Sequence, residues 1–517
     1  GNVTDGSNQR VVQFDYGLPT ANEIYGFTIE AHDIMGFMAL VECNINNRYK
    51  KFPNINFKDH HLAFNREYDR SVAFYTAIRK LFFPWTGYLE IFQIDSDYTT
   101  FMYLPSSGGI IDYEDPFYRY EFVDDNDDKD QWADWTRVNM ETEGFLGAVG
   151  LTNAAGVFPG LDENNDFISD FNQNNNLWPD YDEPFLRYNA DPPEFLFGLD
   201  LDHNTVIDRF EDDTEPDLLY PRGHRGFNAY GGLELAPGVD MKVGRLYERL
   251  LSDNRRSRAT YLVLKAQKDI PTIGRLQAFA QVHRVKDNIP DDQLLWTHPG
   301  GTRGGTRAFQ DPLVAQDAWI NTAYMDVAYS GIPGLTVNHK MKYENYLQQG
   351  ESFAGTFTAG AAKSRLKDAF FVGVIDKVDY ILYLSQDFQL HPKWKSMYRR
   401  RTPLADQLPK GALGRLNEQH DLSEILFLTT TVELMPEMWL KAGLETGLFV
   451  DFLDHPDDDW EDHRHLIYAV QISFLNQSYL GYDMRVNLGL QKEWRWLEST
   501  TERNTSTFVT IFAGAGG

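Results

Sequence analysis

The sequence has a single cysteine, Cys43, in 517 residues, so no disulfide can form within the chain. It contains no Cys-x-x-Cys-His motif for haem attachment. It also lacks any run of about 18 apolar residues, which excludes a helical membrane protein. A scarcity of cysteine suits a protein that is exported through an oxidising periplasm. We expect that a signal segment has been removed ahead of Gly1.

The common catalytic motifs are absent as well. There is no Gly-x-Ser-x-Gly nucleophile elbow, no Gly-x4-Gly-Lys-Ser/Thr phosphate loop and no His-Glu-x-x-His zinc helix. We therefore predict that the chain is not an enzyme and has no catalytic residue. We also expect no nucleic-acid partner.

Alternating apolar and polar residues are the dominant pattern from about Gly226 to the end. Residues 482–496 and 438–452 both follow it, with rows such as Leu440, Ala442 and Leu444 facing Lys441, Gly443 and Glu445. Successive side chains of a β-strand leave opposite faces, so these are strands with one apolar face. A strand of about 9 to 11 residues, tilted, spans a bilayer. The pattern predicts membrane-spanning strands.

The connections between these segments alternate between short and long, as in outer-membrane barrels, where tight turns face the periplasm. Counting segments predicts an all-β fold, a transmembrane antiparallel β-barrel of about 18 strands, with a range of roughly 16 to 18. The count includes an opening strand near Asn8 to Tyr16. We divide the chain into first barrel strands (1–95), an acidic insertion (96–225) and the remaining strands (226–517).

The net charge of −28 is concentrated between Asp112 and Asp217. Two stretches there place oxygen-bearing residues at the spacing of a calcium loop, in which alternate positions surround one ion. The predicted ligands are Asp200, Asp202, Asn204, Val206, Asp208 and Glu211 in one loop, and Asp162, Asn164, Asp166, Ile168 and Asp170 in the other. Both loops lack the glycine usual at the sixth position. Calcium is the expected cofactor.

These loops resemble the calcium loops of thrombospondin type 3 repeats, dockerins and EF-hands. The resemblance implies a calcium-stiffened segment. Aromatic residues between the acids, such as Phe185, Phe195 and Phe197, give the insertion something to pack with, which predicts a folded cap or plug rather than a loose tail. The sequence leaves open whether this insertion lies inside the barrel or above it.

Polar and charged residues share the predicted inner face. The candidates for lining a lumen are Arg275, Gln277, Lys340, Lys342, Glu344, Lys441, Glu445, Arg485, Glu493 and Arg495. Opposite charges on facing walls produce a polar conduit that selects solutes by charge and size. The alternative is that these ions pair with each other and seal a packed interior.

With its strand rhythm and polar inner face, the chain resembles Gram-negative outer-membrane porins, particularly the substrate-selective and alginate-export types. That resemblance implies an outer-membrane channel for hydrophilic solutes, in contact with outer-membrane lipid and lipopolysaccharide. One alternative is a barrel that serves as a scaffold for a protein partner, such as a surface assembly or a multihaem cytochrome conduit. Another is a soluble, calcium-dependent glycan-binding β-protein.

Overall fold

The structure is a computed structural model. It describes residues 18–53, 64–98, 102–103, 119–120, 180–203, 207, 222–290, 293–297, 305–309, 313, 315–349, 351–352, 364–365, 368–385, 388–402, 418–453, 462–477, 482–498 and 500–515. The predicted opening strand at residues 8–16 lies outside these ranges.

One sheet contains 18 of the 24 described strands, and every pairing within it is antiparallel. Its strands are β1 (Leu18–Ile34), β2 (Phe37–Pro53), β3 (Phe64–Phe82), β4 (Trp85–Ile94), β7 (His224–Ala236), β8 (Val239–Leu250), β9 (Arg256–Ile270), β10 (Gly274–Asp287), β13 (Ala318–Ile332), β14 (Leu335–Gln348), β17 (Ala369–Tyr380), the two-residue β18 (Leu382–Tyr383), β19 (Phe388–Thr402), β20 (Gln419–Met435), β21 (Met438–Asp451), β22 (His463–Gln477), β23 (Tyr482–Leu497) and β24 (Thr501–Ala515). Each pairs with the next in chain order, except that β17 and β18 both pair with β19. The predicted all-β fold and strand count are confirmed.

In the described parts of the longer connections, three two-stranded ladders lie outside the main sheet. They are β5 (Met102–Tyr103) with β6 (Arg119–Tyr120), β11 (Gln293–Thr297) with β12 (Gly305–Phe309), and β15 (Glu351–Ser352) with β16 (Ser364–Arg365). Within the described ranges, no helix is long and apolar enough to cross a membrane.

Tight turns at one end of the sheet fix the register of neighbouring strands. Ala236 pairs with Val239 across Pro237 and Gly238, and Ile332 pairs with Leu335 across Pro333 and Gly334. Gly238 and Gly334 have φ angles of 77° and 79°. Proline followed by a residue with positive φ is typical of a type II turn, which explains the Pro-Gly pairs at these positions.

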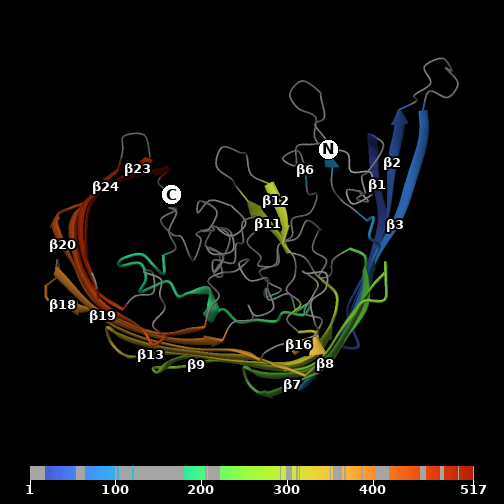
Figure 1. Cartoon of the computed structure of the whole chain (residues 1–517), viewed down its shortest axis with the longest axis horizontal. Coiled ribbons are helices and arrows are strands. Elements are labelled where there is room, and N and C mark those ends of the chain that lie inside the picture. Colours follow the sequence, from blue (N-terminus) through green and yellow to red (C-terminus); the bar gives the residue numbers. More distant parts are fainter. Residues whose placement is uncertain are drawn as a thin grey trace, which may run out of the picture.

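The sheet curves strongly, and Figure 1 shows β1 and β24 at the two ends of the curve. Among the described residues, β1 pairs only with β2 and β24 pairs only with β23. β4 and β7 are neighbours in the sheet although Ile94 and His224 are far apart in sequence. The chain between them holds the acidic insertion, and its segment 180–203 lies on the concave side of the sheet (Figure 1).

The two faces of the sheet differ in chemistry. The face away from segment 180–203, which we call the outer face, exposes large apolar side chains, including Phe27, Ile29, Leu262, Leu264, Leu426, Leu428, Val470, Leu488 and Leu490. The face toward the segment, the inner face, contains buried polar residues such as Glu90, Lys395 and Glu445. A soluble protein with one hydrated face would show the reverse arrangement.

Candidate functional site: a plug segment held on the inner wall

Residues 180–203, which we call the plug segment, follow the inner face as a series of turns with one 3-10 helix at Pro193–Phe195. Its aromatic rings pack against rings of the sheet. Phe197 stacks on Tyr324 with ring centroids 3.9 Å apart, and Phe195 meets Phe371 edge-on at 5.6 Å. Each such pair adds about 0.5–1.5 kcal/mol beyond the area that it buries. The predicted packing role of the aromatic residues in the insertion therefore holds for these rings.

Glycines of the sheet make room for the plug segment. A Cβ atom on Gly373 would lie 2.6 Å from Cζ of Phe195, and one on Gly443 would lie 2.6 Å from Cε1 of Phe185. Real Cβ atoms do not approach other carbons this closely, so a side chain at either position would displace a plug ring. The glycines at position 373 of β17 and position 443 of β21 thus permit close contact between the sheet and the plug segment.

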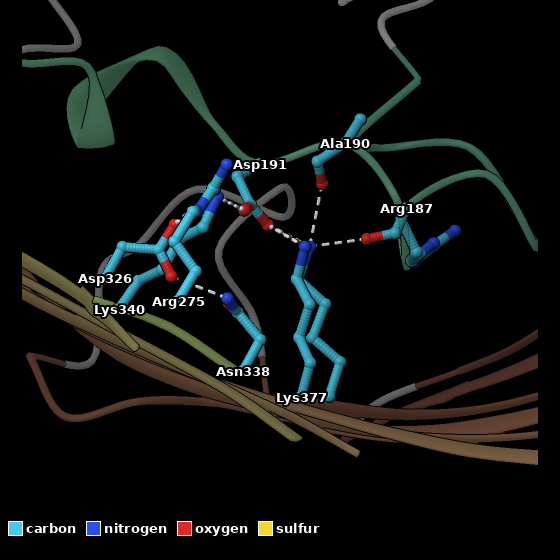
Figure 2. A network of polar contacts seen from close by, with 9 residues as sticks. Arg187, Ala190, Asp191, Arg275, Asp326, Asn338, Lys340 and Lys377 are labelled. Atoms are coloured by element: carbon cyan, nitrogen blue, oxygen red, sulfur yellow. Dashed lines mark hydrogen bonds and ion pairs between the residues drawn. The ribbon is translucent and has the colours of Figure 1, made fainter. Parts of the chain in front are cut away.

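Asp191 of the plug segment is the centre of a buried ionic cluster (Figure 2). Its Oδ1 lies 2.7 Å from Lys377 Nζ and 2.9 Å from Lys395 Nζ, and its Oδ2 accepts a hydrogen bond of 2.8 Å from Lys340 Nζ. Lys395 Nζ also donates to the backbone oxygens of Arg187 and Ala190, at 2.5 and 2.7 Å. One plug carboxylate therefore links three neighbouring strands, β14, β17 and β19.

The pKa of Asp191 reflects this environment. Burial alone raises the pKa of a carboxyl group because it disfavours the charged form. Here the ammonium groups of Lys395, Lys377 and Lys340 outweigh burial and hold the pKa of Asp191 well below its usual range. Asp191 is accordingly ionised at neutral pH.

Two more ionic contacts join the plug segment to the wall. Glu194 lies 3.3 Å from Nη1 of Arg399, and Nε of the same arginine lies 3.1 Å from Asp421. Glu445 accepts a 2.6 Å hydrogen bond from the backbone N–H of Phe185 and lies 3.4 Å from Arg187 Nε. The segment is thus anchored at three points along β14 to β21.

The structure locates most of the candidate lumen residues on the inner face. Lys340 contacts Asp191, Lys342 lies 3.2 Å from Glu344, and Arg275 lies 3.7 Å from Asp326. Gln277 shares the face of Arg275 on β10, and Lys441 shares that of Glu445 on β21. Glu493 and Arg495 are cross-strand partners of Ile467 and His465 on β22, and nothing is described of the Arg485 side chain. Their role as lumen lining stays a prediction.

The predicted calcium ligands are only partly described. Asp200 and Asp202 stand half-buried near the end of the plug segment, whereas Asn204, Val206, Asp208 and Glu211 lie outside the described residues. Asp162, Asn164, Asp166, Ile168 and Asp170 also lie outside them. Among the described residues, no group of three or more His, Cys, Asp and Glu side chains is arranged to hold a metal ion.

His203, at the end of the plug segment, is 2% exposed, and its ring centroid lies 5.8 Å from that of His283 on β10. Burial, with a smaller contribution from His283, lowers the pKa of His203 to about 3. No sequence pattern singles out this histidine, because its burial depends on the docked plug segment.

Sequence reasoning also missed Lys377, Lys395 and Arg399. A signal exists in the register, because Lys377 and Lys395 face each other directly across β17 and β19. Like charges in directly opposed positions destabilise a sheet, so the pair requires a nearby counter-charge. Asp191 supplies it, but the register became visible only with the structure.

Comparison with known proteins finds only distant structural similarity. No family model and no curated protein matches the chain. Among solved structures, OpdK of Pseudomonas aeruginosa with vanillate has 8% identity and a TM-score of 0.25, with 95% of this chain and 91% of that chain covered. OccAB4 of Acinetobacter baumannii has 9% identity and a TM-score of 0.25, with 95% and 90% covered. A loop-deletion mutant of OmpT, an outer membrane protein of Vibrio cholerae, has 7% identity and a TM-score of 0.22, with 56% and 90% covered.

Proposed function

We propose that this chain is an outer-membrane β-barrel channel for hydrophilic solutes, with the plug segment inside its lumen. The observation that carries the proposal is the contrast between the two faces of the sheet. Apolar side chains cover the outer face, and charged side chains and the plug segment occupy the inner face. Strands of 10 to 19 residues are long enough to span a bilayer, and this arrangement of faces is stable only where lipid surrounds the sheet.

A membrane-spanning sheet must also close, because unpaired backbone groups are costly in hydrocarbon. Seventeen of its strands have ten or more residues, so with antiparallel pairing throughout, β1 and β24 run in the same direction. Direct pairing of β1 with β24 would be parallel. An eighteenth long strand between them keeps every pairing antiparallel, and residues 8–16, with Val12, Phe14 and Tyr16 alternating with Gln13 and Asp15, are suited to that position.

Crosslinking tests this closure. With Cys43 replaced by serine, a cysteine at Val12 would be combined in turn with one at Thr505, Thr507, Val509 or Ile511 of β24. We expect one combination to form a disulfide under mild oxidation in detergent. Crosslinking of β1 directly to β24 instead would show a parallel seam.

Calcium is the second part of the proposal. Asp200 and Asp202 lie near the end of the plug segment, and carboxylates at this spacing suit Ca²⁺. An ion held there with Asp208 and Glu211 would fix the end of the plug segment. The earlier set from Asp162 to Asp170 would stiffen the preceding stretch in the same way.

Single-channel recording in planar bilayers tests the main proposal. We expect discrete conductance from the purified protein in detergent, and a larger conductance when the plug segment's contacts are weakened. A barrel that stays closed at every voltage for both wild type and weakened variants would contradict channel function and favour the scaffold alternative. A chain that stays monomeric in buffer without detergent would contradict the membrane assignment and favour the soluble alternative.

A further inference from the structure

Seven basic residues gather on the outer face, at the ends of β7 to β10 that lie away from the tight turns. They are Arg225, Arg245, Arg249, Arg256, Arg258, Arg284 and Lys286, which we call the basic patch. Their orientation follows from the burial of the residues between them, since Leu246, Glu248, Ala259 and Val285 are all buried on the inner face. Alternation along a strand then directs the patch residues outward.

Register brings these charges directly opposite one another. Arg249 pairs with Arg225 on one side and with Arg256 on the other, and Arg258 pairs with Lys286. Directly opposed residues have Cβ atoms about 4.5–5.5 Å apart, and like charges in these positions are destabilising. An anion close by would relieve this repulsion.

The protein supplies little negative charge at this place. The described outward-facing residues of β7 to β10 include no aspartate or glutamate. Asp317 forms ion pairs with Arg284 and with Lys286, the latter at 2.5 Å. Within the described part of the chain, the side chains of Arg225, Arg245, Arg249, Arg256 and Arg258 form no ion pair. This surplus occurs in a chain with a net charge of −28, so it is a local feature.

The surroundings of the patch indicate the kind of anion. Below it on the same face lie apolar residues, including Val243, Leu262, Leu264 and Val282, and the ring of Trp319 lies 5.8 Å from the Arg284 guanidinium. Aromatic and basic side chains bordering an apolar band lie at the level of lipid headgroups. The tight turn at Pro237 and Gly238 marks the periplasmic end, so the patch belongs to the outer leaflet.

We propose that the basic patch binds the phosphorylated headgroup of an outer-leaflet glycolipid, the diphosphorylated lipid A portion of lipopolysaccharide. This inference rests on the proposed outer-membrane location. The planar guanidinium group donates two parallel hydrogen bonds to phosphate, and the row Arg225, Arg249 and Arg256 presents three such groups side by side. Acyl chains attached to the same headgroup would cover the apolar residues below.

Native mass spectrometry of the delipidated protein in detergent tests the site, with diphosphoryl lipid A as the probe. The variant Arg249→Ala/Arg256→Ala/Arg258→Ala should bind it at least tenfold more weakly than wild type. Arg464→Ala is the matched control, because Arg464 is exposed on the outer face of β22 and its cross-strand neighbours Leu448 and Trp496 carry no charge. The control should retain wild-type affinity.

A second variant tests the inference independently, in case the triple variant misfolds. Asp317→Asn removes the carboxylate that pairs with Arg284 and Lys286, so it should bind the probe more tightly than wild type. Dephosphorylated lipid A should bind weakly to every variant. Equal affinity of wild type and triple variant, displacement of the probe by millimolar inorganic phosphate, or equal binding of dephosphorylated lipid A would each overturn the inference. Solubility without detergent would instead defeat the membrane proposal, so the two failures are distinguishable.

Discussion

Replacing Asp191 with asparagine should release the plug segment from the wall. The substitution keeps the shape of the side chain but removes the only charge that the plug contributes to Lys340, Lys377 and Lys395 in the described structure. Lys395 is 3% exposed and Lys377 is 8% exposed, so neither ammonium group is well hydrated while the plug is docked.

The size of the effect follows from this burial. Removing one partner of a buried ion pair costs about 3–5 kcal/mol because it leaves an uncompensated charge. Every 1.4 kcal/mol is a tenfold change in an equilibrium constant, so the undocked population should rise by about two to three and a half powers of ten. The backbone oxygens that Lys395 also contacts offset part of this cost, so the rise in the undocked population should lie near the lower end of this range.

Two assays read the outcome. Hydrogen exchange in residues 180–203 should accelerate, and single-channel recordings should show longer or larger open states. Asp253→Asn is the matched control, because Asp253 pairs with Arg255 at an exposed position and such pairs contribute little. The double variant Asp191→Asn/Lys395→Gln should recover part of the protection. Unchanged exchange and conductance in Asp191→Asn would refute the assignment of Asp191 as the plug's anchor.

Four further predictions concern the same segment. Burial lowers the pKa of His203 to about 3, whereas a histidine in the undocked segment titrates near 6.5. Docking is therefore most stable above about pH 6.5 and weakens as the pH falls. At pH 5 the free energy of docking should fall by about 2 kcal/mol, seen as faster hydrogen exchange, and His203→Phe should abolish this pH dependence. Asp191 has a pKa below its usual range, so its contribution should persist at that pH and be lost only in stronger acid. Gly373→Ala should displace Phe195 and weaken docking by roughly 1–3 kcal/mol, whereas Gly87→Ala, where a Cβ has open space, should leave exchange of residues 180–203 unchanged. Calcium chelation should accelerate hydrogen exchange in the described residues after Phe197, and Asp200→Asn/Asp202→Asn should remove the response of these residues. A response of the same residues that persists in this variant would place their ion elsewhere.

The sequence predicted the sheet well because strand signals are local. Alternation within 438–452 or 482–496 depends only on near neighbours, and the Pro-Gly pairs identify turns without knowledge of the rest of the fold. The site was harder to predict because its contacts are distant in sequence. Lys340 was a candidate from its face on β14, but its partner Asp191 belongs to another part of the chain, and no local pattern connects them.

Plug and wall are therefore not independent parts. Lys377 faces Lys395 across two central strands, and Arg399 four residues further along β19 adds a third cation on the same inner face. Without the plug segment, the described wall at this point would contain directly opposed ammonium groups with no counter-charge, which destabilise the pairing of β17 with β19. The docked Asp191 removes that repulsion while the glycines at 373 and 443 admit the plug's rings. If the proposed channel opens by displacing the plug segment, the opening must hydrate or neutralise these lysines, and a solute that brings its own negative charge to them would lower its cost.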